Sequence, residues 1–89
     1  MTEFLLELYV AKTDCAAVVE GAARLGRAAA LVTAEGQPVR VVRSIFVPQD
    51  ETCYVLVEAA TVDAVHETAL RAALPVERVV EATHDIESL

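Results

Sequence analysis

Apolar residues alternate with other residues along the first segment of the chain. Within residues 3–11, one side of an extended backbone is apolar throughout: Phe4, Leu6, Leu8 and Val10. A period of two residues is typical of a strand that buries one face. Segments 39–47 and 53–59 have a similar strand-forming composition and flank a turn that begins at Pro48, so they predict a hairpin. A fourth strand is predicted over residues 76–83.

Two segments between these strands have apolar residues at helical spacing. The first begins at Thr13, which we expect to be its N-cap, and runs to about residue 33. We expect its buried face to contain Cys15, Val18, Val19, Ala22, Leu25 and Ala29. Gly21 and Gly26 within this helix predict close packing against the sheet or the other helix. The second helix begins at its expected N-cap Thr61 and stops before Pro75.

The predicted order is strand, helix, strand, strand, helix, strand. Two βαβ halves with right-handed crossovers fold into a four-stranded antiparallel sheet that carries both helices on one face. This arrangement is the ferredoxin-like plait, an α+β fold. We expect the domain to span residues 1–84, followed by a short acidic tail over residues 85–89. The strand order of the plait places the first and third strands side by side at the centre of the sheet.

The second face of such a sheet has no helix to cover it. At 89 residues the chain forms one domain that buries only about 60–65% of its unfolded surface, although 55% of its residues are hydrophobic. On the uncovered face we expect Leu5, Tyr9, Val41, Ile45, Tyr54 and Leu56. Monomeric proteins seldom expose so much continuous apolar surface, so we predict a homodimer in which two sheets pack face to face.

The charge of the chain narrows the choice of partner. Fourteen acidic and seven basic residues give a formal charge of −7. This charge repels phosphate, and the basic residues do not cluster, which argues against nucleic-acid binding. The sequence lacks a secretory signal pattern and an apolar run long enough to cross a membrane, so we expect a cytoplasmic protein that does not bind membranes. Cys15 and Cys53 have no metal or redox spacing, and we expect both to be buried free thiols.

Two glutamates within apolar strands are the strongest indication of a functional site. Glu7 and Glu58 each interrupt a strand-forming run, where a charge is costly unless it faces water or a partner. Period-two geometry allows both to lie on the uncovered face, and the central positions of their strands predict that they are adjacent. The residues that we expect to bind a ligand there are Glu7, Tyr9, Arg43, Tyr54 and Glu58.

Three interpretations of these glutamates remain open. They are solvated, or they form salt bridges across the dimer interface with Arg40 or Arg43. Alternatively, a cavity enclosed by the dimer raises the pKa of one carboxyl group, so that Glu7 or Glu58 acts as a catalytic acid or base beside an ionised partner. In the third interpretation the carboxylates are metal ligands.

Several runs of the chain are similar to a family of short bacterial proteins of uncharacterised function. The similarity covers the runs from Ser44 to Ala59 and from Leu74 to Ala82, together with residues 4–7. The family includes a dimeric nickel-binding protein with the ferredoxin-like plait, so the resemblance implies this fold, a homodimer and a nickel ion as possible ligand. Nickel prefers imidazole and oxygen ligands, which makes His66 and His84 the candidate metal ligands.

These patterns lead to two hypotheses for function. The first is a dimeric protein that binds a small ligand, including a divalent metal such as nickel, through the uncovered sheet face. The second is a cofactor-independent isomerase or cyclase, because dimeric plaits of this type also resemble the dimeric α+β barrel enzymes. In that case Glu7 or Glu58 transfers the proton. The sequence favours the first hypothesis, with the enzyme as the alternative.

Overall fold

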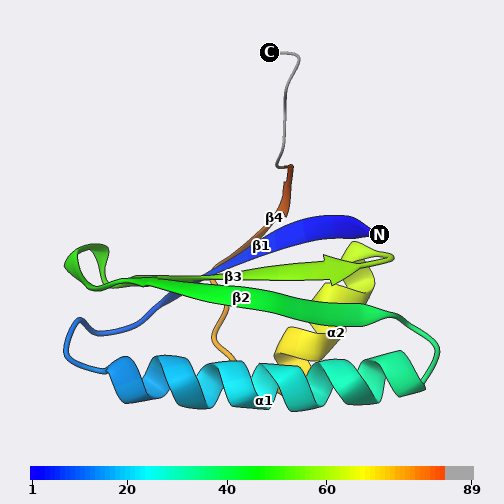
Figure 1. Ribbon diagram of the computed structural model, residues 1–89, viewed down its shortest axis with the longest axis horizontal. Coiled ribbons are helices and arrows are strands. Elements are labelled where there is room, and N and C mark those ends of the chain that lie inside the picture. The colour runs from blue at the N-terminus through cyan, green and yellow to red at the C-terminus, as the bar shows by residue number, and fades with distance from the viewer. Residues whose placement is uncertain (84–89) are drawn as a thin grey trace.

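The computed structural model describes residues 1–83 and has the predicted order of elements (Figure 1). The elements are β1 (Thr2–Tyr9), α1 (Cys15–Ala34), β2 (Val39–Val47), a 3₁₀ helix η1 (Pro48–Asp50), β3 (Thr52–Ala59), α2 (Val62–Arg71) and β4 (Arg78–Ala82). The strands form one antiparallel sheet in the order β2-β3-β1-β4. The predicted ferredoxin-like α+β fold is confirmed. The expected acidic tail lies outside the described residues.

The hydrophobic core lies between the sheet and the two helices, which cover the same face (Figure 1). Alternate residues of the two central strands point into this layer, and Leu6 on β1 and Val57 on β3 are almost completely buried. Leu25 and Val32 of α1 and Val65 of α2 meet them from the helical side. Burial of these aliphatic side chains is the main force that holds the two layers together.

The buried face of α1 differs from the predicted one. The buried residues are Gly21, Leu25, Ala28, Ala29 and Val32, whereas Cys15 is exposed and Val19 is 72% exposed. The predictions that Cys15 and Val19 are buried are therefore wrong, while Cys53 on β3 is buried as expected. Because α1 is rich in alanine, its apolar residues surround much of the helix, and contact with the sheet selects which side is buried.

Each helix begins at a capping side chain and is followed, two residues after its end, by a residue with positive φ. Asp14, not Thr13, caps the start of α1, since its Oδ1 accepts a hydrogen bond from the backbone N–H of Ala17 at 3.1 Å. Gly36, at φ 102°, follows the end of α1. Thr61 caps α2 as predicted, but this helix stops well before Pro75 because Ala73 takes a φ of 55°. A left-handed alanine costs about 1 kcal/mol or more.

The turn after α2 brings Leu74 against α1. A Cβ atom added to Gly21 would lie 3.3 Å from Leu74 Cδ2, which is tighter than an ordinary contact. The predicted close packing at Gly21 is confirmed. The same prediction is wrong for Gly26, which is exposed and would have no atom within 4 Å of its added Cβ.

Arginines connect the two helices on their outer side. Arg24 Nε donates a hydrogen bond to the carbonyl of Ala72 at the end of α2, at 3.0 Å, and its Nη1 pairs with Glu20 as the i,i+4 spacing indicates. Arg71 donates to both carboxylate oxygens of Glu35 at 2.6 Å each and also pairs with Glu67. The end of α2 is thereby attached to the end of α1.

Strand β2 contains an irregularity at one point of its pairing with β3. The register shifts between Val41 and Arg43, so that β2 has one residue more than β3 over this stretch. Such a β-bulge bends the strand and increases its twist. Val41 lies before the bulge, pairs with Val57 and packs against the core, so the expectation that Val41 lies on the uncovered face is wrong.

The difference in burial along α1 predicts the outcome of one pair of substitutions. Leu25→Ala should lower the free energy of unfolding by about 2–5 kcal/mol, because it leaves a cavity in the core. Leu31→Ala, on the same helix but at a side chain that is 58% exposed, should change it by less than about 0.5 kcal/mol. Urea denaturation measures both, and equal effects would contradict the described packing of α1.

The contact between Arg71 and Glu35 predicts a pH dependence. Hydrogen bonds from Arg71, together with its positive charge, lower the pKa of Glu35 below its ordinary value in the folded protein. The pair therefore stabilises the fold at neutral pH, and this contribution disappears as the pH falls through the lowered pKa. In Arg71→Gln, an NMR titration should show a higher pKa for Glu35. In Arg27→Gln the pKa of Glu35 should be the same as in the wild type.

Candidate functional site

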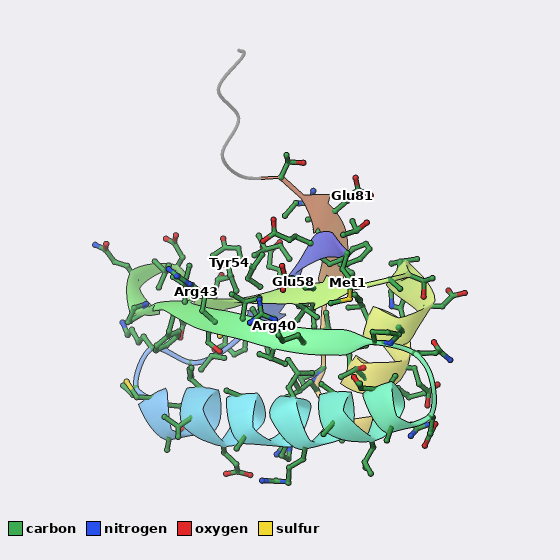
Figure 2. The ribbon with its side chains drawn as sticks, turned by 45° about the vertical axis from the view of Figure 1, so that its right-hand side comes forward. Met1, Arg40, Arg43, Tyr54, Glu58 and Glu81 are labelled. Carbon is green, nitrogen blue, oxygen red and sulfur yellow. The ribbon has the colours of Figure 1, made fainter. Side chains whose placement is uncertain are left out.

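The sheet face opposite the helices carries the residues that the sequence suggested for binding. We call this surface the open face. It is formed by Arg40, Val42, Arg43, Ile45 and Val47 of β2, Thr52, Tyr54, Leu56 and Glu58 of β3, Glu3, Leu5, Glu7 and Tyr9 of β1, and Arg78, Val80 and Ala82 of β4. Figure 2 shows Arg40, Arg43, Tyr54 and Glu58 on the side of the sheet away from α1. No element in the described residues 1–83 covers it.

The register of β1 and β3 separates the two glutamates. Glu7 pairs with Tyr54, whereas Glu58 pairs with Glu3. The apolar pair Leu5 and Leu56 lies between these two rows. Four residue positions along a strand correspond to roughly 13 Å. Glu7 and Glu58 therefore share the open face, but the prediction that they are adjacent is wrong, because period-two geometry fixes the face of a residue and not its row.

Each of the two glutamates faces an arginine of an outer strand. Arg40 donates to Glu58 Oε1 from Nε at 2.9 Å and also from Nη2. Arg78 Nη1 lies 3.9 Å from Glu7 Oε2. Glu58 is thus bound to Arg40 within its own chain, whereas the sequence suggested a salt bridge between subunits. Exposed pairs of this kind contribute at most about 1 kcal/mol.

A depression of about 510 Å³ lies on the β2 side of the open face. Its polar lining consists of Glu3, Arg40, Arg43 and Glu58, and its apolar lining consists of Val42, Ile45 and Leu56. This volume falls within the range of small-molecule sites, in which an apolar lining combines with a few polar groups. Of the residues predicted to bind a ligand, Arg43 and Glu58 meet in this depression.

The two tyrosines occupy different parts of the open face. Tyr54 is half-buried and pairs with Ile45 on one side and Glu7 on the other. The Tyr9 hydroxyl donates to Glu51 Oε2 at 3.3 Å, in the turn between η1 and β3. The negative charge of Glu51, followed by burial and this hydrogen bond, raises the pKa of Tyr9. Tyr9 thus belongs to the end of the face and not to the depression.

Two lining residues were not singled out in the sequence. Glu3 lies four residues before Glu7, on the same side of β1, so alternation could have placed it on this face. Val42 reaches the depression because the bulge displaces it, and no sequence signal in β2 indicates the bulge.

Of the two candidate metal ligands, the structure describes only His66. His66 is exposed on α2, which lies on the opposite side of the sheet, and His84 lies outside the described residues (Figure 1). Within residues 1–83, no group of three or more His, Cys, Asp or Glu side chains is arranged to hold a metal ion. The structure thus places His66 away from the open face, and nickel binding stays a prediction.

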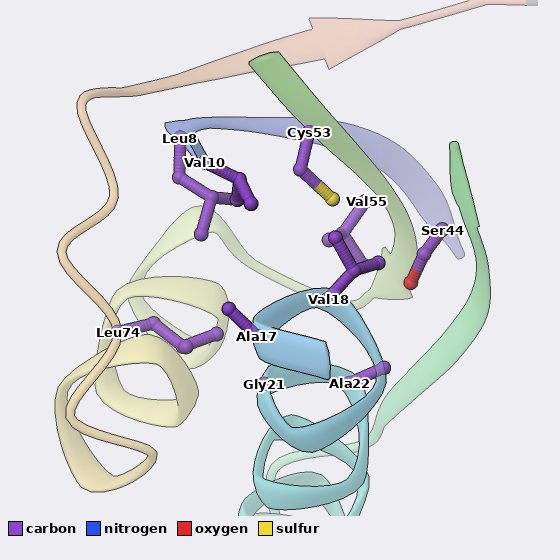
Figure 3. Close-up of a pocket in the computed structure, with 10 residues that line it drawn as sticks. All are labelled: Leu8, Val10, Ala17, Val18, Gly21, Ala22, Ser44, Cys53, Val55 and Leu74. Atoms are coloured by element: carbon purple, nitrogen blue, oxygen red, sulfur yellow. The ribbon is translucent and has the colours of Figure 1, made fainter. Parts of the chain in front are cut away.

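Two other cavities are less suited to bind a ligand, one because of its size and the other because its charged groups are already paired. Figure 3 shows a cavity between α1 and the sheet, lined by side chains that include Val18, Cys53, Val55 and Leu74. Its volume of about 10 Å³ corresponds to a single water molecule, and its lining is almost entirely apolar. Burial raises the pKa of the Cys53 thiol, so it stays protonated at neutral pH. A second depression, between the helices, contains Arg24 and Arg71, both of which are already paired with glutamates.

Comparison with known proteins identifies no relative. The chain matches no protein-family model, no curated protein and no solved structure. None of the helices in residues 1–83 has the length and apolar character that crossing a membrane requires. We therefore infer the function from the geometry of the open face.

The contact between Tyr9 and Glu51 predicts that substitution of Glu51 changes the pKa of Tyr9. Glu51→Gln removes the neighbouring negative charge, so the pKa of Tyr9 should fall toward its ordinary value near 10.0. NMR titration of the Tyr9 ring measures this change. Asp50→Asn, in the same turn, should leave the pKa of Tyr9 unaltered, and an equal effect of both variants would contradict a specific contact with Glu51.

Proposed function

We propose that this protein is a homodimer that binds a small ligand between two open faces. The observation that supports this proposal is the apolar band across the middle of the open face. Leu5, Leu56 and Val80 pair in register across β1, β3 and β4. On β2, Val42 and Ile45 extend the apolar surface on either side of Arg43, which pairs with Leu56. A continuous apolar surface of this kind, bordered by polar residues, is typical of a protein or ligand interface.

The charge of the open face favours a second copy of the chain as the partner. Three arginines and three glutamates give the face a formal charge of zero: Arg40, Arg43, Arg78, Glu3, Glu7 and Glu58. The formal charge of −7 therefore resides on the rest of the chain. Two copies repel each other least when these neutral faces meet.

The size of the open face is sufficient for a dimer. Strands of 8, 9, 8 and 5 residues, at about 3.3 Å per residue and about 4.8 Å between strands, give a sheet area of roughly 480 Å². Two such faces would bury about 1,000 Å² in total, which is the lower limit for a specific interface. In this arrangement the depression beside Arg43 becomes an enclosed site.

The lining of the depression favours an organic ligand. Its apolar side chains suit a carbon skeleton, and its charged groups can orient one polar substituent. A metal ion bound at Glu58 would have to compete with the guanidinium group of Arg40, which already occupies that carboxylate. Proton transfer by Glu7 or Glu58 stays a prediction of the sequence.

The molecular mass in solution tests the dimer. At micromolar concentration, sedimentation equilibrium should give twice the chain mass of 9.5 kDa. Leu56→Lys places a charge in the centre of the apolar band and should produce a folded monomer with unchanged circular dichroism. Leu70→Lys, at a side chain on α2 that is 75% exposed, should remain dimeric. A wild-type chain that sediments at 9.5 kDa would refute the proposal.

A further inference from the structure

We infer that the ligand of the open face is a small apolar monocarboxylate whose carboxylate group pairs with Arg43. This inference rests on the proposed function and specifies the chemical class of the ligand.

Arg43 differs from the other two arginines of the open face. Arg40 is bound to Glu58, and Arg78 lies near Glu7. Arg43 makes no hydrogen bond or ion pair with any residue in the part of the chain that the structure describes. Its guanidinium group, which lines the depression, is therefore available to a ligand. Figure 2 shows Arg43 on the side of the sheet away from α1.

The bulge in β2 sets the surroundings of Arg43. Because β2 has one extra residue here, Val42 and Arg43 both face the depression, and Arg43 pairs with Leu56. Ile45 follows on the same face. A cation thus stands beside three aliphatic side chains, which matches a molecule with one anionic end and an apolar body.

The chemistry of guanidinium selects a carboxylate. Its N–H groups form a planar fork that binds both oxygens of a carboxylate at once. Exclusion of water by a second open face would strengthen this pair, and it would make an unpaired Arg43 costly. A bound carboxylate removes that cost.

The charge balance of the depression favours a ligand with a single negative charge. Its four charged side chains, Arg40, Arg43, Glu3 and Glu58, have a formal charge of zero together, and Arg40 is already paired with Glu58. A monocarboxylate leaves one net negative charge in the depression, whereas a dicarboxylate or a phosphate dianion leaves two, in a chain whose formal charge is already −7. The alkyl chain of a monocarboxylate lies on Leu56 and its aliphatic neighbours.

The probe for this inference is hexanoate, with hexanamide as its neutral counterpart of the same shape. Calorimetric titration of the wild-type dimer should detect hexanoate binding at least tenfold tighter than hexanamide or the dianion glutarate. Arg43→Gln should weaken hexanoate binding at least tenfold while the protein remains dimeric. The matched control is Arg27→Gln, which removes the same charge from an exposed position on α1 and should leave binding unchanged.

Other outcomes would overturn the inference in distinguishable ways. Equal binding of hexanoate and hexanamide, or of hexanoate to wild type and Arg43→Gln, excludes the carboxylate pair and leaves the dimer proposal intact. Preferential binding of hexylamine assigns the site to cations instead. If Arg43→Gln dissociates the dimer and hexanoate does not bind, Arg43 pairs with an acid of the second copy. A monomeric wild-type protein refutes the proposed function itself.

Discussion

Two helices cannot cover both faces of a four-stranded sheet, and this constraint determines the rest of the molecule. Every strand alternates its side chains between the faces, so each core residue of β1 or β3 has neighbours that point away from the helices. The helical side accordingly became a dense aliphatic layer around Leu6 and Leu25. The other side carries an apolar band that no element of the described chain covers. The proposals for assembly and ligand binding both follow from this asymmetry.

Much of the fold could be predicted because local signals agreed with tertiary structure. Alternation and proline gave the range of β2 correctly, and Thr61 marked the start of α2. The orientation of α1 could not be predicted in the same way, since alanines and valines such as Val19 lie on several sides of this helix. The early end of α2 depends on a left-handed Ala73, and alanine gives no sequence signal for that conformation.

The sequence predicts which residues lie on the open face, but it does not predict how they are arranged there. Because side chains alternate between the two faces of a strand, the sequence predicts that Glu7, Tyr54 and Glu58 share one face, and the structure confirms this. Which residues meet across strands depends on register. The turn around η1 sets only the register between β2 and β3. Glu7 and Glu58 are separated by the pairing of β1 with β3, two strands that no local turn connects. The depression depends further on the bulge in β2. Alternation therefore predicts the correct surface, whereas the predicted cluster of Glu7 and Glu58 is two separate rows in the structure.

The bulge at Val42 also bears on how copies of this chain can associate. Strand β2 is an edge, with backbone groups on its outer side that could accept another strand. Addition of chains along such an edge has no natural end and leads to fibres. A local change of twist in the middle of β2 makes it a poor template for a straight incoming strand. This irregularity therefore disfavours the indefinite addition of chains along β2.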